Sequence, residues 1–225
     1  MQKNARTVQG IIEEKLKKIL KINKVNLIGS GRTDAGVHAN EQIANISLET
    51  NMTFVQIKNA LNSILPKDIY INDCRETDDQ FNARFSAKKR EYIYYIIDDY
   101  SPTKRMYYWQ CKWSLNEQKL NKCASMIIGE KKFSLLSKAS SETKNKICNI
   151  YESSWIFNKG YAEYRIVGNR FLQHMVRLLV GTMIEVSRNR IPVKDFNKML
   201  QCKDTNYTSV RAPALGLFLN KIYYE

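Results

Sequence analysis

Residues 29–40 have the sequence GSGRTDAGVHAN, which is the most informative stretch of the chain. It follows a short apolar run at residues 25–28 and precedes residues 44–48, where apolar and polar side chains alternate. Its three glycines permit tight turns and the close approach of a ligand around Arg32 and Asp34. Loops at strand edges are where reactive polar groups are commonly displayed. From the residues alone, a functional loop and a hairpin loop with a solvated ion pair both remain open.

Outside this stretch, the spacing of apolar residues alternates between a helical and a strand-like period. Helices are expected at residues 8–20, 54–64, 115–127, 171–186 and 193–200, and strands at residues 25–28, 44–48, 69–76, 91–98, 146–157, 161–167 and 216–224. Thr7 and Thr53 precede the first two helices and are expected to cap them. A hairpin is expected around Asn158-Lys159-Gly160.

The order of these elements predicts an α+β fold. Runs of adjacent strands favour antiparallel or mixed sheets over a doubly wound parallel sheet. The second part of the chain approximates the first in its order of elements, so we expect two similar α/β halves with a cleft between them. The basic segment at residues 81–90 follows neither period and indicates a connector, which places the boundary near residue 88.

The charge of the chain points to an anionic partner. Among its 225 residues, 36 Lys and Arg stand against 22 Asp and Glu, a formal net charge of +14. This excess favours nucleic acid, bound through phosphate contacts and counterion release, although a general lysine bias of composition is an alternative explanation. The 44% of hydrophobic and 26% of charged residues are typical of a soluble globular protein and exclude disorder for most of the chain.

Several classes of protein are excluded by what the sequence lacks. No apolar run reaches the roughly 18 residues of a membrane span, and the N-terminus has no apolar signal-peptide core. We therefore expect a cytoplasmic protein without a membrane anchor. The five cysteines are odd in number with none at C-x-x-C spacing, and there are only two histidines, so neither a disulfide framework nor a metal site is expected.

Further motifs accompany the string GRTDAGVHA at residues 31–39. They are NARTVQG at residues 4–10, FNARFSA at residues 81–87, Tyr92-Ile93-Tyr94, NRFLQHMVRLLVG at residues 169–181, and Ala212-Pro213-Ala214 followed by Gly216-Leu217-Phe218-Leu219. In content and order these segments resemble the tRNA pseudouridine synthase A family over essentially the whole chain. The nine contiguous residues of the first string make this resemblance far more specific than a lone glycine motif.

The resemblance implies the pseudouridine synthase fold. Residues 1–88 would form the N-terminal half with the catalytic loop, and residues 89–225 the C-terminal half with the tyrosine and arginine of the site. It also implies a homodimer that isomerises uridine to pseudouridine at positions 38–40 of the tRNA anticodon stem-loop. This reaction breaks a carbon–nitrogen glycosidic bond and rejoins base and sugar through carbon. Because there is no net redox change and no transfer to water, no cofactor and no metal are expected.

The resemblance assigns the nucleophile of this reaction to Asp34, which adds to the base or attacks the ribose. Arg177, on the late helix, is matched to the arginine that pairs with this aspartate and takes part in catalysis. Burial raises the pKa of a carboxylate and a nearby cation lowers it, so such a pair would keep Asp34 ionised. A snorkelling arginine on an amphipathic helix is the alternative for Arg177.

Two further residues are matched to the handling of the target nucleotide. Tyr92 corresponds to the tyrosine that stacks on the target base, an interaction worth roughly 1–3 kcal/mol, although tyrosine is also a common strand residue. Arg32 corresponds to the catalytic-loop arginine that helps to displace and hold the flipped nucleotide. Phe171 and Leu172 are candidates for the pocket wall, with core packing as the simpler expectation.

Basic residues elsewhere are candidates for tRNA contacts, although each taken alone fits a solvated side chain. They are Arg84, Lys88, Lys89, Arg90, Lys138, Lys144, Lys146, Arg165, Arg170 and Arg188. His38 lies inside the first motif without an obvious role in proton transfer, so we expect a structural hydrogen bond. His174, on the late helix, is expected to be packed or to face tRNA rather than to be catalytic.

The sequence departs from the family pattern at its start. The family begins with a strand and a Gly-Trp-Gln-x-Gln segment, and this chain begins inside that segment at residues 1–3. We expect the opening strand to be lacking, which would expose a sheet edge. A tRNA-binding protein or RNA chaperone without catalytic activity is therefore an alternative. A small-molecule hydrolase using Asp34 is disfavoured by the charge of the chain.

Overall fold

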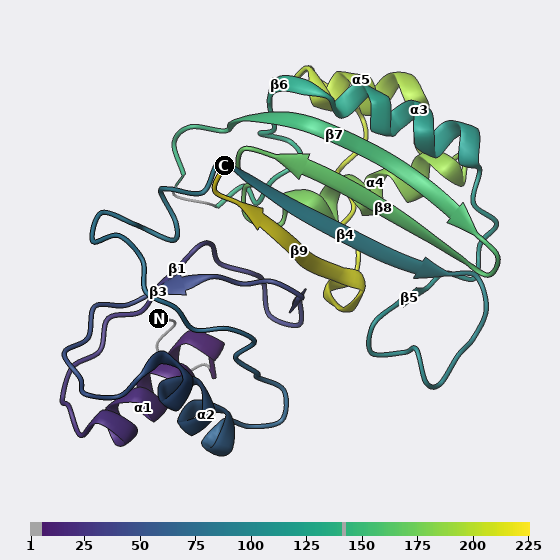
Figure 1. Cartoon of the computed structure of the whole chain (residues 1–225). Helices are drawn as coiled ribbons and strands as arrows, with labels where there is room; N and C mark the ends of the chain where they lie inside the picture. Colours follow the sequence, from purple (N-terminus) through teal and green to yellow (C-terminus); the bar gives the residue numbers. More distant parts are fainter. Residues whose placement is uncertain (1–5, 141–142) are drawn as a thin grey trace. The chain divides into compact units, whose positions relative to one another are not determined.

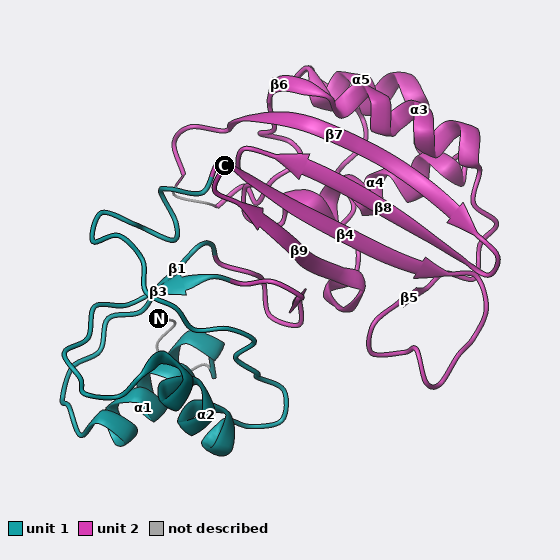
Figure 2. Ribbon diagram, viewed as in Figure 1, with its two compact units in different colours: residues 1–31, 43–87 teal, residues 32–42, 88–225 magenta. Residues whose placement is uncertain are grey.

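The computed structural model describes residues 6–140 and 143–225, so Asn4 and Ala5 of the NARTVQG motif lie outside the described residues. The chain divides into two compact units (Figure 2). The first contains residues 1–31 and 43–87, and the second contains residues 32–42 and 88–225. The junction after Ala87 falls beside the boundary expected near residue 88.

The loop of residues 32–42 packs with the second unit rather than with the N-terminal half, where the sequence-based division put it. Within the loop, β2 (His38–Ala39) pairs in parallel with β9 (Leu217–Tyr223). The Asn40 amide also donates to the Leu219 carbonyl at 2.9 Å. Hydrogen bonds to a strand at the other end of the chain therefore decide which unit holds the loop.

The two helices of the first unit begin where their capping residues predict. At the start of α1 (Val8–Leu20), the Thr7 side chain accepts a hydrogen bond from the Gly10 amide. At the start of α2 (Phe54–Ile64), Thr53 forms a reciprocal capping box with Gln56. Local sequence is thus sufficient to set both helix N-termini.

The core of the first unit lies between these helices. Leu16 of α1 is buried together with Ile57 and Leu61 of α2. β1 (Ile28–Gly29) and β3 (Ala44–Asn45) pair antiparallel as a two-stranded sheet. The expected strand at residues 44–48 is therefore shorter than its alternating pattern indicates.

The prediction of a strand at residues 69–76 is wrong, because no strand forms there in the described chain. The Asn62 side chain accepts from the Ile71 amide at 2.8 Å and donates to the Ile71 carbonyl at 2.9 Å. A side-chain amide of α2 thus satisfies the backbone groups that a neighbouring strand would have paired. The spacing of apolar residues does not distinguish a paired strand from an extended segment that bonds to a side chain.

The second unit is built on a seven-stranded mixed sheet in the order β2-β9-β4-β8-β7-β6, with β5 paired beside β4 (Figure 1). The remaining strands are β4 (Lys89–Ile97), β5 (Trp109–Gln110), β6 (Gly129–Lys132), β7 (Ile147–Asn158) and β8 (Tyr161–Gly168). The long neighbours are antiparallel, whereas β2 and β5 pair in parallel. The hairpin expected around Asn158-Lys159-Gly160 is confirmed. Gly160 has a φ of +82°, a backbone conformation that glycine adopts readily and other residues rarely do.

Three helices cover one face of this sheet (Figure 1): α3 (Glu117–Ile127), α4 (Met175–Ser187) and α5 (Val193–Leu200). A short 3-10 turn, η1 (Ala214–Gly216), precedes β9. Tyr94 and Ile96 of β4 and Tyr164 and Ile166 of β8 are fully buried under the helices. Their spacing of two residues is the strand period, which sends alternate side chains to the same face.

The fold is α+β, as expected, but the two units are unequal. The sheet of the first unit has two strands and that of the second has seven. The similarity expected between the halves is therefore not found in their sheets among the described residues. Pairing at residues 44–48 extends over only two residues, and residues 69–76 bond to a helix side chain instead.

The helix expected at residues 171–186 begins only at Met175. His174 precedes it with φ 64° and ψ −2°, in the left-handed region that a right-handed helix cannot continue. Phe171 and Leu172 consequently lie in the connection before α4 rather than on the helix. Apolar spacing does not indicate this turn, because the connection also begins with two apolar residues.

Gly181 allows the chain to pass directly over α4. A Cβ atom at this position would lie 2.2 Å from the Val210 carbonyl oxygen and 2.8 Å from the Ala212 nitrogen. The Ala212 amide donates to the Arg177 carbonyl at 3.0 Å, and the Val210 amide donates to Thr182 Oγ1 at 3.1 Å. The segment at residues 210–212 is thereby fixed against the helix.

Glu91, a buried carboxylate on β4, connects strands β8 and β9 to the loop. It is 4% exposed and accepts hydrogen bonds from Asn220 Nδ2 at 2.6 Å and Tyr223 Oη at 2.8 Å. Arg165 Nη2 of β8 donates to it at 2.7 Å. Asn220 Oδ1 in turn accepts from Asn40 Nδ2 of the loop at 3.0 Å. Burial by itself raises the pKa of Glu91, but the hydrogen bonds outweigh it, so the pKa lies below its ordinary value of 4.5.

The contact of Gly181 with backbone atoms predicts that Gly181→Ala displaces the segment at residues 210–212. We expect the free energy of unfolding to fall by about 1–3 kcal/mol, as for other overpacked cores. Urea denaturation followed by tryptophan fluorescence measures it, because all three tryptophans lie in the second unit. Ser125→Ala, on the exposed side of α3, is the control, and equal stability of the two variants would contradict the prediction.

The hydrogen bonds of Glu91 predict an acid-dependent contribution to stability. At neutral pH, Glu91→Gln should lower the free energy of unfolding by about 1–3 kcal/mol. Because folding lowers the pKa of Glu91, the carboxylate stabilises the protein above its unfolded pKa, and this contribution is lost as the pH falls through the folded value.

The difference between wild type and Glu91→Gln in urea denaturation should therefore shrink as the pH falls well below 4.5, the ordinary pKa of glutamate. Glu130→Gln, an exposed substitution on β6, should leave both stability and its pH dependence close to wild type. A difference for Glu91→Gln that stays constant into strong acid would show that its charge is not responsible.

Candidate active site

A tight turn presents Asp34 at the start of the loop in the second unit. The Asp34 carbonyl accepts a hydrogen bond from the Val37 amide at 3.1 Å, which closes a four-residue turn. Gly36 occupies its third position with a φ of +80°, a conformation that favours glycine. A Cβ at Gly36 would also lie 3.3 Å from Cβ of Ala214. Turn geometry and close packing therefore both favour glycine here.

The ion pair expected between Asp34 and Arg177 forms in the structure. Arg177 Nη1 donates to Asp34 Oδ2 at 2.9 Å, and the two side chains are 12% and 17% exposed, respectively. Arg177 Nε donates to the Ala212 carbonyl oxygen at 2.9 Å. Because two acceptors orient the guanidinium, the partly buried charges of Arg177 and Asp34 compensate each other in a defined geometry.

His174 is a third member of this site that the sequence reasoning left as packed or facing tRNA. Its Nε2 lies 3.7 Å from Asp34 Oδ1, and its Nδ1 lies 3.2 Å from Arg211 Nη1. Its left-handed backbone directly before α4 is a sparsely populated conformation of the kind that clusters at functional sites. The sequence does contain a signal that His174 lies near Arg177. Residues three apart at the start of a helix lie on the same side, and His174 is three residues before Arg177.

The hydrogen bonds of His174 indicate its tautomer. An arginine side chain can only donate, so Nδ1 accepts from Arg211 and the proton of the neutral ring is assigned to Nε2, which faces Asp34. Burial is the largest cause that lowers the pKa of His174 below 6.5, and the carboxylate of Asp34 opposes it. Neighbouring cations, among them Arg211 and Lys138, lower this pKa further. His174 is therefore neutral at physiological pH.

Tyr92 occupies the central strand β4 at an irregularity. The pairing of β4 with β9 shifts register between Glu91 and Tyr92, and such bulges re-aim side chains. The ring packs edge-on against Phe171, with 5.1 Å between centroids. Burial, opposed by Arg90 and reinforced by the Asp34 carboxylate, raises the pKa of Tyr92 to about 12, so the hydroxyl stays protonated at neutral pH.

The remaining residues singled out in the sequence have different surroundings. Arg32 is exposed, and within the described chain its side chain has no hydrogen bond or ion pair. Leu172 is buried in the core, and Phe171 packs against that core in part. The structural hydrogen bond expected for His38 is confirmed: Nε2 donates to the Met106 carbonyl at 3.0 Å, and the ring stacks on Phe218.

Buried cysteines are poor candidates for a second nucleophile. All five are free thiols, and three of them are buried. Burial raises the pKa of Cys123 to about 12 and that of Cys148 to about 11, so these sulfurs remain protonated and unreactive. Across the described part of the chain, no three His, Cys, Asp or Glu side chains group as metal ligands do. Among the same residues, no helix is long and apolar enough to cross a membrane.

Comparison with known proteins supplies an independent finding. The sequence profile of a family described as tRNA pseudouridine synthase matches residues 1–86 and 123–225. This match includes Arg32, Asp34 and Arg177, whereas Tyr92 lies in the segment between its two parts.

Individual relatives are similar over nearly the full length of both chains. A protein named tRNA pseudouridine synthase A from Thermoanaerobacter sp. (strain X514) is 37% identical over 225 residues, which cover 99% of this chain and 92% of the relative. Proteins of the same name are 38% identical in Borrelia hermsii (strain HS1 / DAH), over 97% and 90% of the two chains, and 34% identical in Latilactobacillus sakei subsp. sakei (strain 23K), over 100% and 92%. The chain therefore belongs to the tRNA pseudouridine synthase family and is an isomerase.

Proposed function

We propose that the protein converts uridine to pseudouridine at positions 38–40 of the tRNA anticodon stem-loop, with Asp34 as the nucleophile. The observation that carries this proposal is the ion pair between Asp34 and Arg177, at 2.9 Å and mostly shielded from water. A carboxylate that is paired with a cation, oriented and sheltered has properties that covalent catalysis requires. Membership of the family supplies the reaction class, and the net charge of +14 suits an RNA substrate.

The chemistry needs little more than this carboxylate. The bond from ribose C1′ to N1 of uracil breaks, and a bond from C1′ to C5 forms after the base has turned. C5 loses a proton and N1 gains one, so substrate and product have the same composition. Asp34 forms a transient covalent bond, either to the base or to the ribose, and is released unchanged. No redox cofactor has a role in this balance.

Arg177 contributes by fixing the nucleophile. Its guanidinium is held by the Ala212 carbonyl on one side and by Asp34 on the other. Because an arginine stays charged at every physiological pH, the ion pair is not lost through deprotonation of its cation. The neutral His174, with a proton on Nε2, faces the second carboxylate oxygen. Arg177 thus orients Asp34 through Oδ2, whereas His174 is a close neighbour of Oδ1 at 3.7 Å, beyond hydrogen-bond distance.

Tyr92 and Arg32 are proposed to handle the target nucleotide. The tyrosine ring, braced by Phe171, offers a face on which uracil can stay stacked while it turns. Arg32 is exposed on the same loop as Asp34 and has no partner among the described residues that would hold it away from RNA. Extruding a base costs a few kcal/mol, which such contacts offset. We further propose that the protein acts as a homodimer in the cytoplasm.

Replacement of the nucleophile is the direct test of this function. Asp34→Asn should lower pseudouridine formation on unmodified tRNA by at least about 1,000-fold, because removal of a nucleophile eliminates the covalent route. Binding of tRNA should persist, since the substitution removes a negative charge and preserves the shape. Chemical mapping of pseudouridine and a filter-binding assay measure the two effects.

Asp79→Asn, an exposed substitution in the first unit, is the matched control and should retain full activity. Tight binding without product from the wild-type protein would favour the alternative of a tRNA-binding protein or RNA chaperone. Product from wild type and Asp34→Asn at equal rates would eliminate Asp34 as the nucleophile.

A pair of substitutions tests the stacking role of Tyr92. Tyr92→Ala should lower kcat/KM by about tenfold or more, the equivalent of the roughly 1–3 kcal/mol that stacking contributes. Tyr92→Phe keeps the ring face and should cost clearly less. Single-turnover rates on unmodified tRNA measure both. If the phenylalanine variant is as impaired as the alanine variant, the hydroxyl rather than the ring face carries the role.

A further inference from the structure

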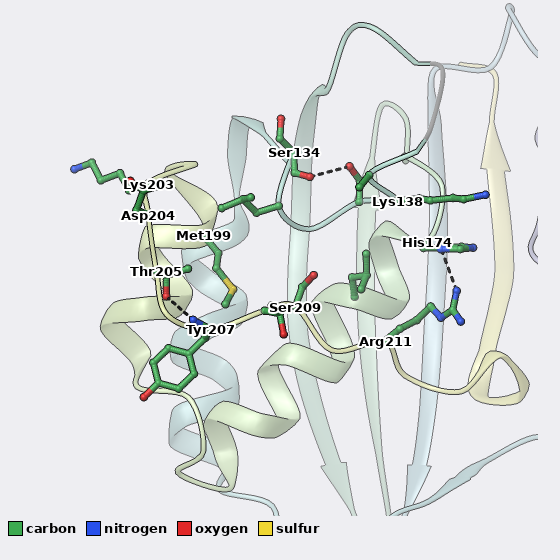
Figure 3. Close-up of a pocket in the computed structure, with 15 residues that line it drawn as sticks. Ser134, Lys138, His174, Met199, Lys203, Asp204, Thr205, Tyr207, Ser209 and Arg211 are labelled. Carbon is green, nitrogen blue, oxygen red and sulfur yellow. Dashed lines mark hydrogen bonds between the residues drawn. The ribbon is translucent and has the colours of Figure 1, made fainter.

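A groove of about 700 Å³ lies in the second unit beside the candidate active site (Figure 3). Four parts of the chain line it: residues 134–139 between β6 and β7, the beginning of α4, Met199 of α5, and residues 203–211 after α5. Its volume is in the range of small-molecule sites, and it is large enough for a nucleotide. The proposed reaction does not itself use this space.

Positive charge gathers at one end of the groove. Lys138 and Arg211 lie there on either side of the neutral His174, whereas Asp204 lies beside Lys203 at the opposite end (Figure 3). The Lys138 amide donates to the Gln173 carbonyl at 2.9 Å, which fixes its backbone next to His174. Asp204 is the single carboxylate among the lining residues, so none of the lining carboxylates lies beside Lys138 and Arg211.

His174 joins the groove to the nucleophile. It lines the groove, contacts Arg211 through Nδ1 at 3.2 Å, and lies 3.7 Å from Asp34 through Nε2. One imidazole ring therefore separates the cationic end of the groove from the carboxylate. A ligand held there by Arg211 would be an immediate neighbour of whatever group reacts with Asp34.

The lining also suits the rest of a nucleotide. Leu178 and Met199 provide apolar surface for a ribose or base, and the hydroxyl-bearing Ser137 and Ser209 lie among the lining residues. Arginine and lysine are the side chains that bind phosphate, arginine through its fork and lysine as a point charge. An anionic group attached to a partly apolar body is the ligand that matches this combination.

We propose that the groove binds the phosphate and ribose of the nucleotide next to the target uridine, with Arg211 and Lys138 on the phosphate. This subsite rests on the proposed function, because it takes Asp34 to mark the position of the target. It assigns Lys138 and Arg211 to substrate binding rather than to the chemical step. A phosphate seated there would also offset the positive potential around His174.

The test uses the salt dependence of tRNA binding in the inactive Asp34→Asn background. Lys138→Gln and Arg211→Gln should each weaken binding of an unmodified tRNA transcript. Each should also reduce the slope of log affinity against log salt by about 0.7–0.9, the value for one lost phosphate contact. Lys159→Gln, an exposed substitution in the β7–β8 turn, is the matched control and should leave the slope unchanged.

Kinetics in the wild-type background provide the second readout. Lys138→Gln and Arg211→Gln should raise KM for tRNA severalfold with a smaller effect on kcat. Thermal unfolding confirms that each variant is folded, and since Lys138 and Arg211 are tested separately, one well-folded variant is sufficient. Salt slopes and KM values equal to those of Lys159→Gln would overturn the proposal.

Competition by 5′-UMP and by inorganic phosphate separates RNA from a free nucleotide or ion. If either ligand binds through Arg211 while tRNA affinity is the same in wild type and Arg211→Gln, the groove serves the free ligand and the proposal is overturned. The proposed function fails separately, when the wild-type protein yields no pseudouridine. The changes in salt slope would in that case still show that the groove contacts RNA.

Discussion

The ion pair between Asp34 and Arg177 is the interaction on which the arrangement of the candidate active site depends. The two residues are 143 positions apart in the sequence, and their side chains are mostly withdrawn from water. A residue at position 34 without an acceptor would leave the charge of Arg177 partly buried and unpaired, which is unfavourable, whereas asparagine keeps one acceptor oxygen there. The loop, the start of α4 and the segment at residues 210–212 must therefore reach their positions together, because each supplies a part of the same electrostatic contact.

Other features hold these three segments in place without taking part in the pair. Glu91, through Asn220 and Asn40, connects the loop to the middle of the sheet. Gly181 lets the segment at residues 210–212 lie directly on α4, so that the Ala212 carbonyl can accept from Arg177. A site assembled from distant segments needs such supports, because errors of about 1 Å in the position of a reacting group reduce catalysis substantially. Stability and the geometry of the carboxylate are consequently linked.

The surroundings of Asp34 have to accommodate both an anionic nucleophile and an anionic substrate. The nucleophile must be anionic, while the substrate is a polyanion that would be repelled by it. Arg177 balances the carboxylate at short range, and Arg211 and Lys138 extend positive charge into the neighbouring groove. His174 lies between them and stays neutral, since burial and these cations lower its pKa. A neutral ring at this point adds no charge that would compete with Arg177 for the carboxylate.

The sequence by itself determined the local features and the reaction class. Thr7 and Thr53 predicted helix starts because capping is a local interaction, and the motif around Asp34 predicted a family that comparison confirmed. The catalytic roles that the resemblance assigns to individual residues stay a prediction. Only the tertiary structure decided that the loop packs with the C-terminal strands, that the backbone of Ile71 pairs with a side chain, and that His174 adjoins Asp34. The physical reason is that periodicity records burial and local hydrogen bonding, whereas these contacts depend on which distant segment supplies the partner.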